Sequence, residues 1–316
     1  MIEIAEVVEI AEIVVVILVA TLRAGTPLVL AALGELITEK SGVLNLGVEG
    51  MMLVGAVAAI IATLGTGSYL FGALAGTLAG LAMALVFGLL TLSLRANQVA
   101  AGLALTIFGL GLSAFLGLGY RDKPLDGLKP LAVSGLSDIP VIGPLFFGHD
   151  IFVYLSLAMF VAVAWVLARS RGGLVLKAVG EAPEAAHALG HKVLAVRYAA
   201  TAFGGAMAGL AGAYLTLVYT PMWADQMTAG RGWIALALVV FATWKPGRVL
   251  LGAYLFGGVT IAQLHLQAQG VAVSSHILAM LPYVATILVL VLIARDATRI
   301  KLNAPAALGK PFDPGR

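Results

Sequence analysis

The sequence of 316 residues has no cysteine, and only 11% of its residues are charged. Without cysteine the chain can form no disulfide and no thiolate metal site, and it has no cysteine nucleophile. The scarcity of charge accompanies 61% hydrophobic residues and a mean hydropathy of +1.03. These values lie far outside the balance of a water-soluble globular domain, so they predict a membrane protein that crosses the bilayer several times.

Signatures of catalysis are also missing from the sequence. It has no H-E-x-x-H motif, and the histidine pair with helical ligand spacing, His187 and His191, has no third ligand nearby. It has no G-x-x-x-x-G-K-[ST] phosphate loop, because "LGKP" near residue 309 lacks both the earlier glycine and the Ser or Thr. We therefore expect no catalytic residue, metal or cofactor in this chain, and any ATP and magnesium would be bound by a partner subunit.

Six long segments contain no Lys, Arg, Asp or Glu, and each is long enough to cross a hydrocarbon core of about 30 Å as a helix. They are residues 69–94, 99–119, 151–168, 198–219, 249–268 and 276–294. Their residues do not alternate with a period of two, as the strands of a membrane β-barrel would. The expected fold class is therefore all-α, a polytopic membrane protein.

Four weaker apolar segments lie between these six, at residues 7–22, 24–37, 48–64 and 233–244. Together they give about ten membrane helices, some of them short or broken. We thread these segments alternately across the membrane, with the N-terminus inside. Five basic residues then lie outside, namely Arg23, Arg121, Lys123, Lys129 and Arg231. The other 14 of the 19 lie inside, as the positive-inside rule requires, so we expect both termini to be cytoplasmic. The net charge of +3 reflects this asymmetry and indicates no nucleic-acid partner.

We expect residues 1–297 to form the membrane domain and residues 298–316 to form a cytoplasmic tail. An external loop at about 120–149 is rich in turn formers and long enough to cover a pore mouth or receive a partner. The chain begins with Glu3, Glu6, Glu9 and Glu12, spaced three apart. This spacing favours a retained acidic helix at the membrane surface that runs into a short span.

The internal loop at about 169–197 carries start and stop signals for a two-turn helix. Pro183 suits the first turn, Glu184 complements the helix dipole, and Gly190 suits the left-handed position after the end. The alternative is that this loop is a plain structural connector.

Small residues recur every four positions in two of the long segments, which predicts close helix packing in lipid, either within the subunit or at an interface between subunits. They are Gly72, Gly76, Gly80, Ala84 and Gly88 in one segment, and Gly205 and Gly209 in the other.

The stretch "EKSGVLNLGVEGMMLVGA", residues 39–56, interrupts two short apolar pieces with polar residues and glycines. Broken helices at membrane depth are tolerated where they line a cavity, and polar residues there are functional candidates by default. The residues that we expect along a substrate pathway are Glu35, Asn45, Glu49, Asn97 and Gln98. A helix that began near Asn45 would place Asn45 and Glu49 on one face.

Structural alternatives exist for these polar residues. Asn45 and Asn97 are suited to capping helices, and Glu49 could pair with Lys40 at the cytoplasmic interface. The polar residues Gln263 and His265 lie toward the external end of their segment, where an interfacial position explains them.

Three stretches resemble, in order, the signature regions of permease subunits from bacterial ATP-binding-cassette (ABC) importers of the ribose, branched-chain amino acid and nucleoside type. They are "SGVLNLGVEGMMLVGA", "RANQVAAGLALTIFGLGLSAFLG" and "AVGEAPEAAHALG". The resemblance covers residues 24 to 297, and "GVLNLGVEGMM" is most similar to the branch that is paired with basic-membrane-protein-type receptors and imports nucleosides.

This resemblance implies a multi-pass subunit of the bacterial inner membrane that imports nucleosides or a related sugar-containing solute. The partners that it implies are a cytoplasmic ATP-binding subunit, a second permease in a homo- or heterodimer, and an extracytoplasmic solute-binding lipoprotein. The ATPase would dock on the coupling helix of the internal loop through Gly180, Glu181, Pro183, Glu184, Ala186, Leu189 and Gly190. The alternative is a stand-alone ion-coupled transporter or channel with Glu35 or Glu49 as the ion site, although no inverted repeat is obvious.

Overall fold

The computed structural model describes residues 4–131, 135–137, 139–269, 274–294 and 303–313. All regular elements among these residues are helices, and seven of them are long and apolar enough to cross a membrane. These candidate spans are Ile13–Lys40, Val48–Thr66, Tyr69–Ser93, Gln98–Tyr120, Ile151–Arg169, Val193–Tyr219 and Pro246–Ala268. The predicted all-α polytopic fold is confirmed, and the predicted number of about ten segments is approximate.

The predicted segments 7–22 and 24–37 form one continuous helix, α1 (Ile4–Lys40), so their separation was wrong. Pro27 lies inside α1 and lacks the N–H that would bond to the carbonyl of Arg23. The hydroxyl of Tyr214 donates to that carbonyl at 3.0 Å instead. Because the freed carbonyl finds this partner, the helix continues through the proline. Glu3 and the side chains of the other glutamates of the predicted acidic helix lie outside the described residues.

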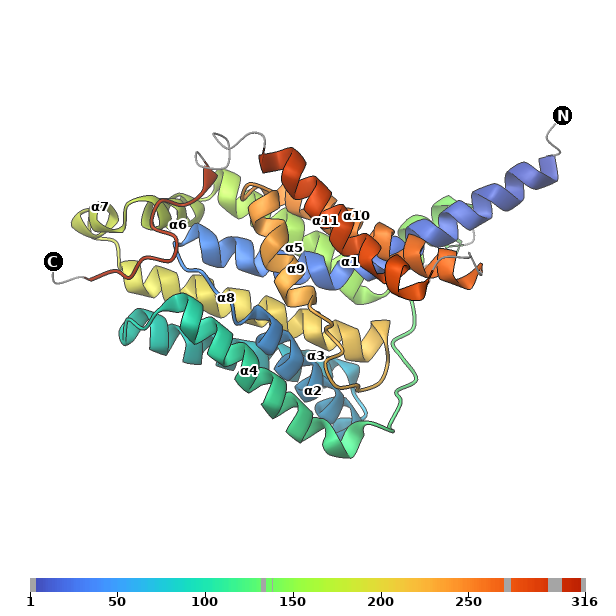
Figure 1. Cartoon of the computed structure of the whole chain (residues 1–316), viewed down its shortest axis with the longest axis horizontal. Coiled ribbons are helices and arrows are strands. Elements are labelled where there is room, and N and C mark those ends of the chain that lie inside the picture. The colour runs from blue at the N-terminus through green and yellow to red at the C-terminus, as the bar shows by residue number, and fades with distance from the viewer. Residues whose placement is uncertain (1–3, 132–134, 138, 270–273, 295–302, 314–316) are drawn as a thin grey trace.

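The beginning of the first helix and the C-terminal segment lie far apart in the structure (Figure 1). Figure 1 shows the beginning of α1 and the C-terminal segment 303–313 at opposite ends of the molecule. The C-terminal segment lies at the end that carries the helices of the internal loop. The side of the membrane on which each terminus lies stays a prediction.

The other long segments form helices close to the predicted bounds. They are α2 (Val48–Thr66), α3 (Tyr69–Gly88), α4 (Gln98–Gly117), α5 (Ile151–Arg169), α8 (Val193–Tyr214), α10 (Pro246–Ala268) and α11 (Ser275–Ala294). Short helical turns extend three of them, namely η1 (Leu89–Ser93) after α3, η2 (Leu118–Tyr120) after α4, and η4 (Leu215–Tyr219) after α8. A separate turn, η3 (Gly143–Phe147), precedes α5. Helix α9 (Arg231–Phe241) has only 11 residues, so it is too short to cross the bilayer.

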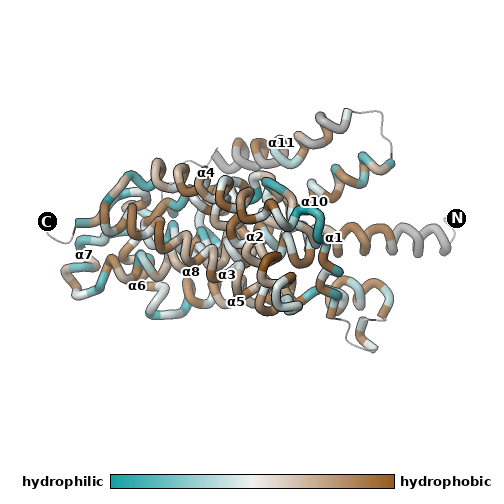
Figure 2. Tube along the Cα trace, turned by 90° about the horizontal axis from the view of Figure 1, so that it is seen from below, coloured by the Kyte–Doolittle hydropathy of each residue, from teal (hydrophilic) through white to brown (hydrophobic). Residues whose placement is uncertain are grey.

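Helix α8 lies at the centre of the bundle, beside α1, α2 and α3 (Figure 1). A Cβ on Gly80 of α3 would lie 2.2 Å from the carbonyl oxygen of Gly205 and 2.6 Å from the Cα of Gly209, both in α8. The two backbones therefore touch, as the predicted small-residue pattern requires. Hydrophobic positions fill the middle of the molecule, and hydrophilic ones are found mainly toward its two ends, one of which carries α7 (Figure 2).

The internal loop folds into two short helices, α6 (Arg171–Glu181) and α7 (Pro183–Ala188). Helix α7 begins at Pro183, and Gly190 has a φ of 86° shortly after its end, as the start and stop signals predict. Helix α6 was not predicted. In the predicted external loop, Leu125 and Leu128 donate backbone hydrogen bonds to Pro221 and Leu217, so the loop at 120–149 lies against η4 and the turn after it.

Candidate functional site

The connection between α1 and α2, residues 41–47, is non-helical and largely buried. Helix α2 begins at Val48, so Asn45 precedes the helix and does not share a helix face with Glu49. The side-chain oxygen of Asn45 accepts a hydrogen bond from the backbone N–H of Gly47 at 3.0 Å. Asn45 therefore closes a local turn before the helix, close to the capping role given as its alternative.

Two other predicted pathway residues hold this connection from outside it. Glu35 Oε1 accepts from the backbone N–H of Asn45 at 3.2 Å, and Gln98 Oε1 accepts from that of Leu44 at 2.8 Å. Glu35 and Gln98 are 1% and 4% exposed. Their second polar atoms, Glu35 Oε2 and Gln98 Nε2, are buried and have no hydrogen-bond partner among the described residues. The structure thus brings Glu35, Asn45 and Gln98 together around one stretch of backbone whose N–H groups need partners at membrane depth.

Asn97 is the N-cap of α4, and its side chain accepts a hydrogen bond from the backbone N–H of Ala100 at 3.0 Å. The residue is exposed, beside the buried Gln98. The capping alternative is therefore the one that its contacts show.

Glu49 lies in the first turn of α2 as predicted, and its carboxylate is buried against the start of α9. Oε1 accepts from the hydroxyl of Thr228 at 2.5 Å and from the N–H of Gly230 at 2.9 Å, while Oε2 accepts from the N–H of Gly232 at 2.6 Å. A helix N-terminus has unpaired N–H groups and a partial positive charge, both of which a carboxylate satisfies. The alternative pairing of Glu49 with Lys40 does not occur, because the ammonium of Lys40 donates to the carbonyl of Asn303 at 3.0 Å.

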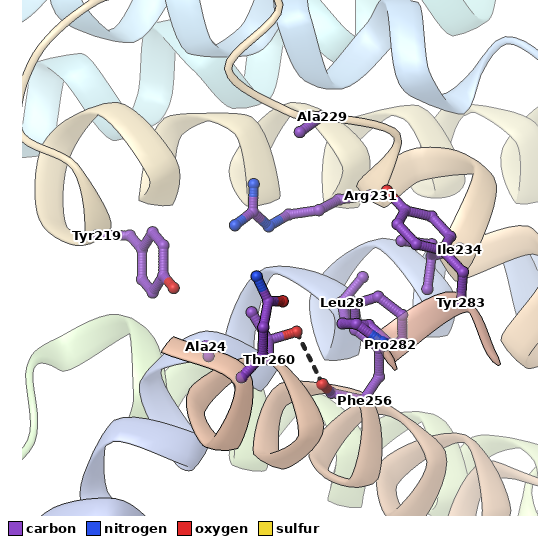
Figure 3. A pocket seen from close by; sticks show the side chains of 11 residues that line it. Ala24, Leu28, Tyr219, Ala229, Arg231, Ile234, Phe256, Thr260, Pro282 and Tyr283 are labelled. Carbon is purple, nitrogen blue, oxygen red and sulfur yellow. Dashed lines mark hydrogen bonds between the residues drawn. The ribbon is translucent and has the colours of Figure 1, made fainter. Parts of the chain in front are cut away.

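A cavity of about 230 Å³ lies beside this helix start, in the half of the bundle away from α6 and α7 (Figure 3). It is half open to the surface and is bounded by α1, η4, the loop before α9, and helices α9, α10 and α11. The residues that line it are Ala24, Leu28, Tyr219, Ala229, Arg231, Ile234, Phe256, Thr260, Gln263, Pro282 and Tyr283. Arg231 extends across the cavity toward Tyr219 (Figure 3), and its guanidinium carbon lies 5.4 Å from the centre of that ring.

The five predicted pathway residues do not line this cavity, yet Glu49 is linked to it. The residues that Glu49 binds, Thr228 and Gly230, flank the cavity residue Ala229, and Gly232 follows Arg231. Sequence reasoning assigned Arg231 only to the external side. The available signal was an arginine between two glycines at the start of a short apolar helix.

The predicted coupling residues lie at the opposite end of the bundle. A Cβ on Gly180 would lie 2.2 Å from the carbonyl oxygen of Lys40, so α6 ends directly against the end of α1. Pro183 and Ala186 are buried, whereas Glu184 is exposed and Leu189 is 79% exposed. Helix α7 therefore has one packed face and one free face.

The C-terminal segment, residues 303–313, is bound to this end of the bundle. Its backbone N–H groups at Ala307 and Gly309 donate to the carbonyls of Gly180 and Gly42 at 2.9 and 3.1 Å. Arg197 of α8 donates to the carbonyl of Lys310 at 3.0 Å. Further contacts join Phe312 to the cluster of Val179, Ala186 and Val193, Arg95 to Asp313, and Glu181 to the N–H of Ala306. Sequence analysis treated this segment as a tail and missed these contacts.

A family model described as "Branched-chain amino acid transport system / permease component" matches residues 17–294. Among relatives, TsgC13 of Haloferax volcanii is 42% identical over 93% of this chain and 96% of its own length. Its name provisionally describes it as a glucose ABC transporter permease. The guanosine ABC transporter permease NupQ of Bacillus subtilis is 32% identical over 95% of this chain and 97% of its own length. The nucleoside ABC transporter permease NupC of Lactococcus lactis is 32% identical over 88% of this chain and 92% of its own length. No solved structure matches the chain.

Proposed function

The chain belongs to the family of branched-chain amino acid transport system permease components and is a permease of an ABC transporter, and we propose that it imports a nucleoside or a related sugar-containing solute. The names of three relatives support this solute class, since guanosine and other nucleosides contain a sugar ring and glucose is a sugar. The family membership also favours this function over a stand-alone ion-coupled transporter.

The observation that carries the proposal has two parts: α6 packs against the end of α1, and one face of α7 is exposed. A short helix that is packed on one side can transmit the movement of a partner to the long helices that it contacts. Here Gly180 contacts the end of α1, and α7 is followed directly by the central helix α8. We propose that a separate ATP-binding subunit docks on α7 through Leu189 and Glu184. That subunit would bind ATP and magnesium.

The same proposal includes a second permease subunit, an extracytoplasmic solute-binding lipoprotein and a position in the bacterial inner membrane. The end with α6, α7 and the C-terminal segment would be cytoplasmic, because the internal loop there is rich in basic residues. Glu35, Asn45 and Gln98 remain predicted pathway residues, since they gather at the break between α1 and α2.

The test uses the permease co-expressed with its ATP-binding subunit and reconstituted in liposomes. We expect Leu189→Asp to lower solute-stimulated ATP hydrolysis several-fold without changing the amount of permease inserted. Leu131→Asp in the external loop is the matched control, because Leu131 is also exposed, at 48%. Equal coupling in both variants, or a permease that never co-purifies with an ATP-binding subunit, would contradict the proposal.

A further inference from the structure

The cavity beside α9 has a lining that suits a particular kind of solute. Three aromatic side chains, Tyr219, Phe256 and Tyr283, contribute to its walls. Flat rings of this kind stack against other flat rings, and the stacking tolerates many ring types. A lining with three aromatic residues therefore favours a solute that carries a planar heterocycle.

Arg231 supplies the directional group of the cavity. Its Nη1 donates to the carbonyls of Met227 and Thr228 at 3.2 and 3.3 Å, and its remaining N–H groups make no hydrogen bond to the described residues. Among the described residues it also forms no ion pair. A guanidinium presents five donors in a planar fork, so the remaining ones can bind the carbonyl and ring-nitrogen acceptors of a heterocycle.

The other polar groups of the cavity disfavour one solute class. The lining contains the amide of Gln263 and the hydroxyl of Thr260, which donates to the carbonyl of Phe256 at 2.9 Å, but no carboxylate. An amino acid carries an ammonium group that would need an anionic or acceptor-rich partner, and burying it without one is costly. The cavity thus matches an uncharged solute better than a zwitterion.

The contacts of Glu49 give this cavity a fixed wall. Three hydrogen bonds from Thr228, Gly230 and Gly232 hold the backbone on both sides of Arg231, while Tyr219 lies beside its guanidinium. A recognition group whose backbone and side chain are both held loses little conformational freedom when a ligand binds.

We propose that this cavity is a binding site within the permease for the heterocyclic base of a nucleoside, with Arg231 and Tyr219 as the recognition pair. The proposal rests on the proposed import function and specifies its solute. The site lies in the half of the bundle that is opposite α7, where a solute released by an external receptor would first meet the permease.

The experiment measures binding of guanosine by calorimetry to the permease, purified with its ATP-binding subunit in lipid nanodiscs and without any receptor. We expect Arg231→Gln and Tyr219→Ala each to weaken guanosine binding by about tenfold or more, the effect of losing one bidentate or stacking contact. Arg121→Gln is the matched control, because Arg121 is an exposed external arginine that pairs with Asp225. Ribose should bind more weakly than guanosine, and leucine should not compete.

Unchanged guanosine affinity in both variants, no binding to the unmodified complex, or equal competition by leucine would overturn this proposal. If Arg231→Gln fails to fold, Arg231→Lys keeps the charge but loses the planar fork. A drop in guanosine affinity in that variant, with an unchanged melting temperature without ligand, supports the same conclusion, and an unchanged affinity refutes it. The coupling test on Leu189 does not depend on this cavity, so the two proposals can fail separately.

Discussion

The two ends of the bundle are stabilised in different ways. At the end with the cavity one buried carboxylate, Glu49, holds the start of α9 through three hydrogen bonds. At the end with α7 the C-terminal segment 303–313 holds α6 and the end of α1 through several backbone hydrogen bonds, a buried ring and an exposed ion pair. The polar contacts at the start of α9 thus converge on one side chain, whereas those of the C-terminal segment are distributed.

This difference suits the two proposed tasks. A wall fixed by one residue can rearrange if that residue changes partners, which a solute site needs during release. A surface joined by many contacts moves as one body, which the transmission of a partner's motion needs. Variants that perturb one end at a time can therefore test the comparison.

The largest effect is expected for Glu49→Ala. It leaves the N–H groups of Gly230 and Gly232 and the hydroxyl of Thr228 without their acceptor in a buried place. We expect the free energy of unfolding to fall by about 3–5 kcal/mol and solute binding to be lost. Thermal unfolding of the purified permease measures the first effect. Glu184→Ala, at an exposed glutamate, should change stability little, and equal losses in both variants would mean that Glu49 has no special role.

A smaller loss of stability is expected for Phe312→Ala at the end with α7. Phe312 is 5% exposed, packs with Val179, Ala186 and Val193, and lies edge-on to His187. Removing the ring should lower the free energy of unfolding by about 3 kcal/mol and reduce the coupling of ATP hydrolysis to solute.

The matched control for Phe312 is Phe146→Ala, because Phe146 is 59% exposed. Coupling is read as the ratio of solute-stimulated to basal ATP hydrolysis in the reconstituted complex. Guanosine affinity should stay unchanged in Phe312→Ala, since the cavity beside α9 is untouched. A variant that loses guanosine affinity but retains coupling would contradict the division between the two ends.

A third prediction compares glycines at the second position of two helices. A Cβ on Gly232 of α9 would lie 2.6 Å from the Cα of Glu49, whereas a Cβ on Gly247 of α10 would meet nothing within 4 Å. Gly232→Ala should therefore push α9 away from α2 and destabilise the permease by about 1–3 kcal/mol. Gly247→Ala should be neutral or slightly stabilising. Equal melting temperatures of the two variants would show that the contact between α9 and α2 is loose.

Much of this fold could be predicted from sequence, because a run of about 20 apolar residues in a membrane can only satisfy its backbone as a helix. Local signals likewise found α7, whose start and stop lie within eight residues. The continuity of α1 could not be found in this way. It depends on the hydroxyl of Tyr214, which is 191 positions away from the carbonyl of Arg23 that it satisfies.

The candidate site was harder to predict for the same reason. Glu49 was correctly singled out as a polar residue at membrane depth, but its partner Thr228 is 179 positions away. The cavity takes its lining from four helices, one helical turn and a loop, so no single stretch of sequence contains its pattern. The C-terminal segment binds largely through backbone groups, which every sequence has, so composition gave no signal for it.

The smallest effect is expected for the ion pair between Arg95 and Asp313. The pair is bidentate, at 2.8 and 2.9 Å, but its side chains are 48% and 37% exposed. Solvent screens such pairs, so Arg95→Ala should lower the free energy of unfolding by less than about 1 kcal/mol. Arg95→Asp should weaken coupling more than Arg95→Ala, because it places two carboxylates together, and adding Asp313→Arg should restore it. If the reversed pair does not restore the ratio of stimulated to basal ATP hydrolysis, then the ion pair does not help to hold the C-terminal segment. The backbone hydrogen bonds of the segment and the ring of Phe312 would then hold it alone.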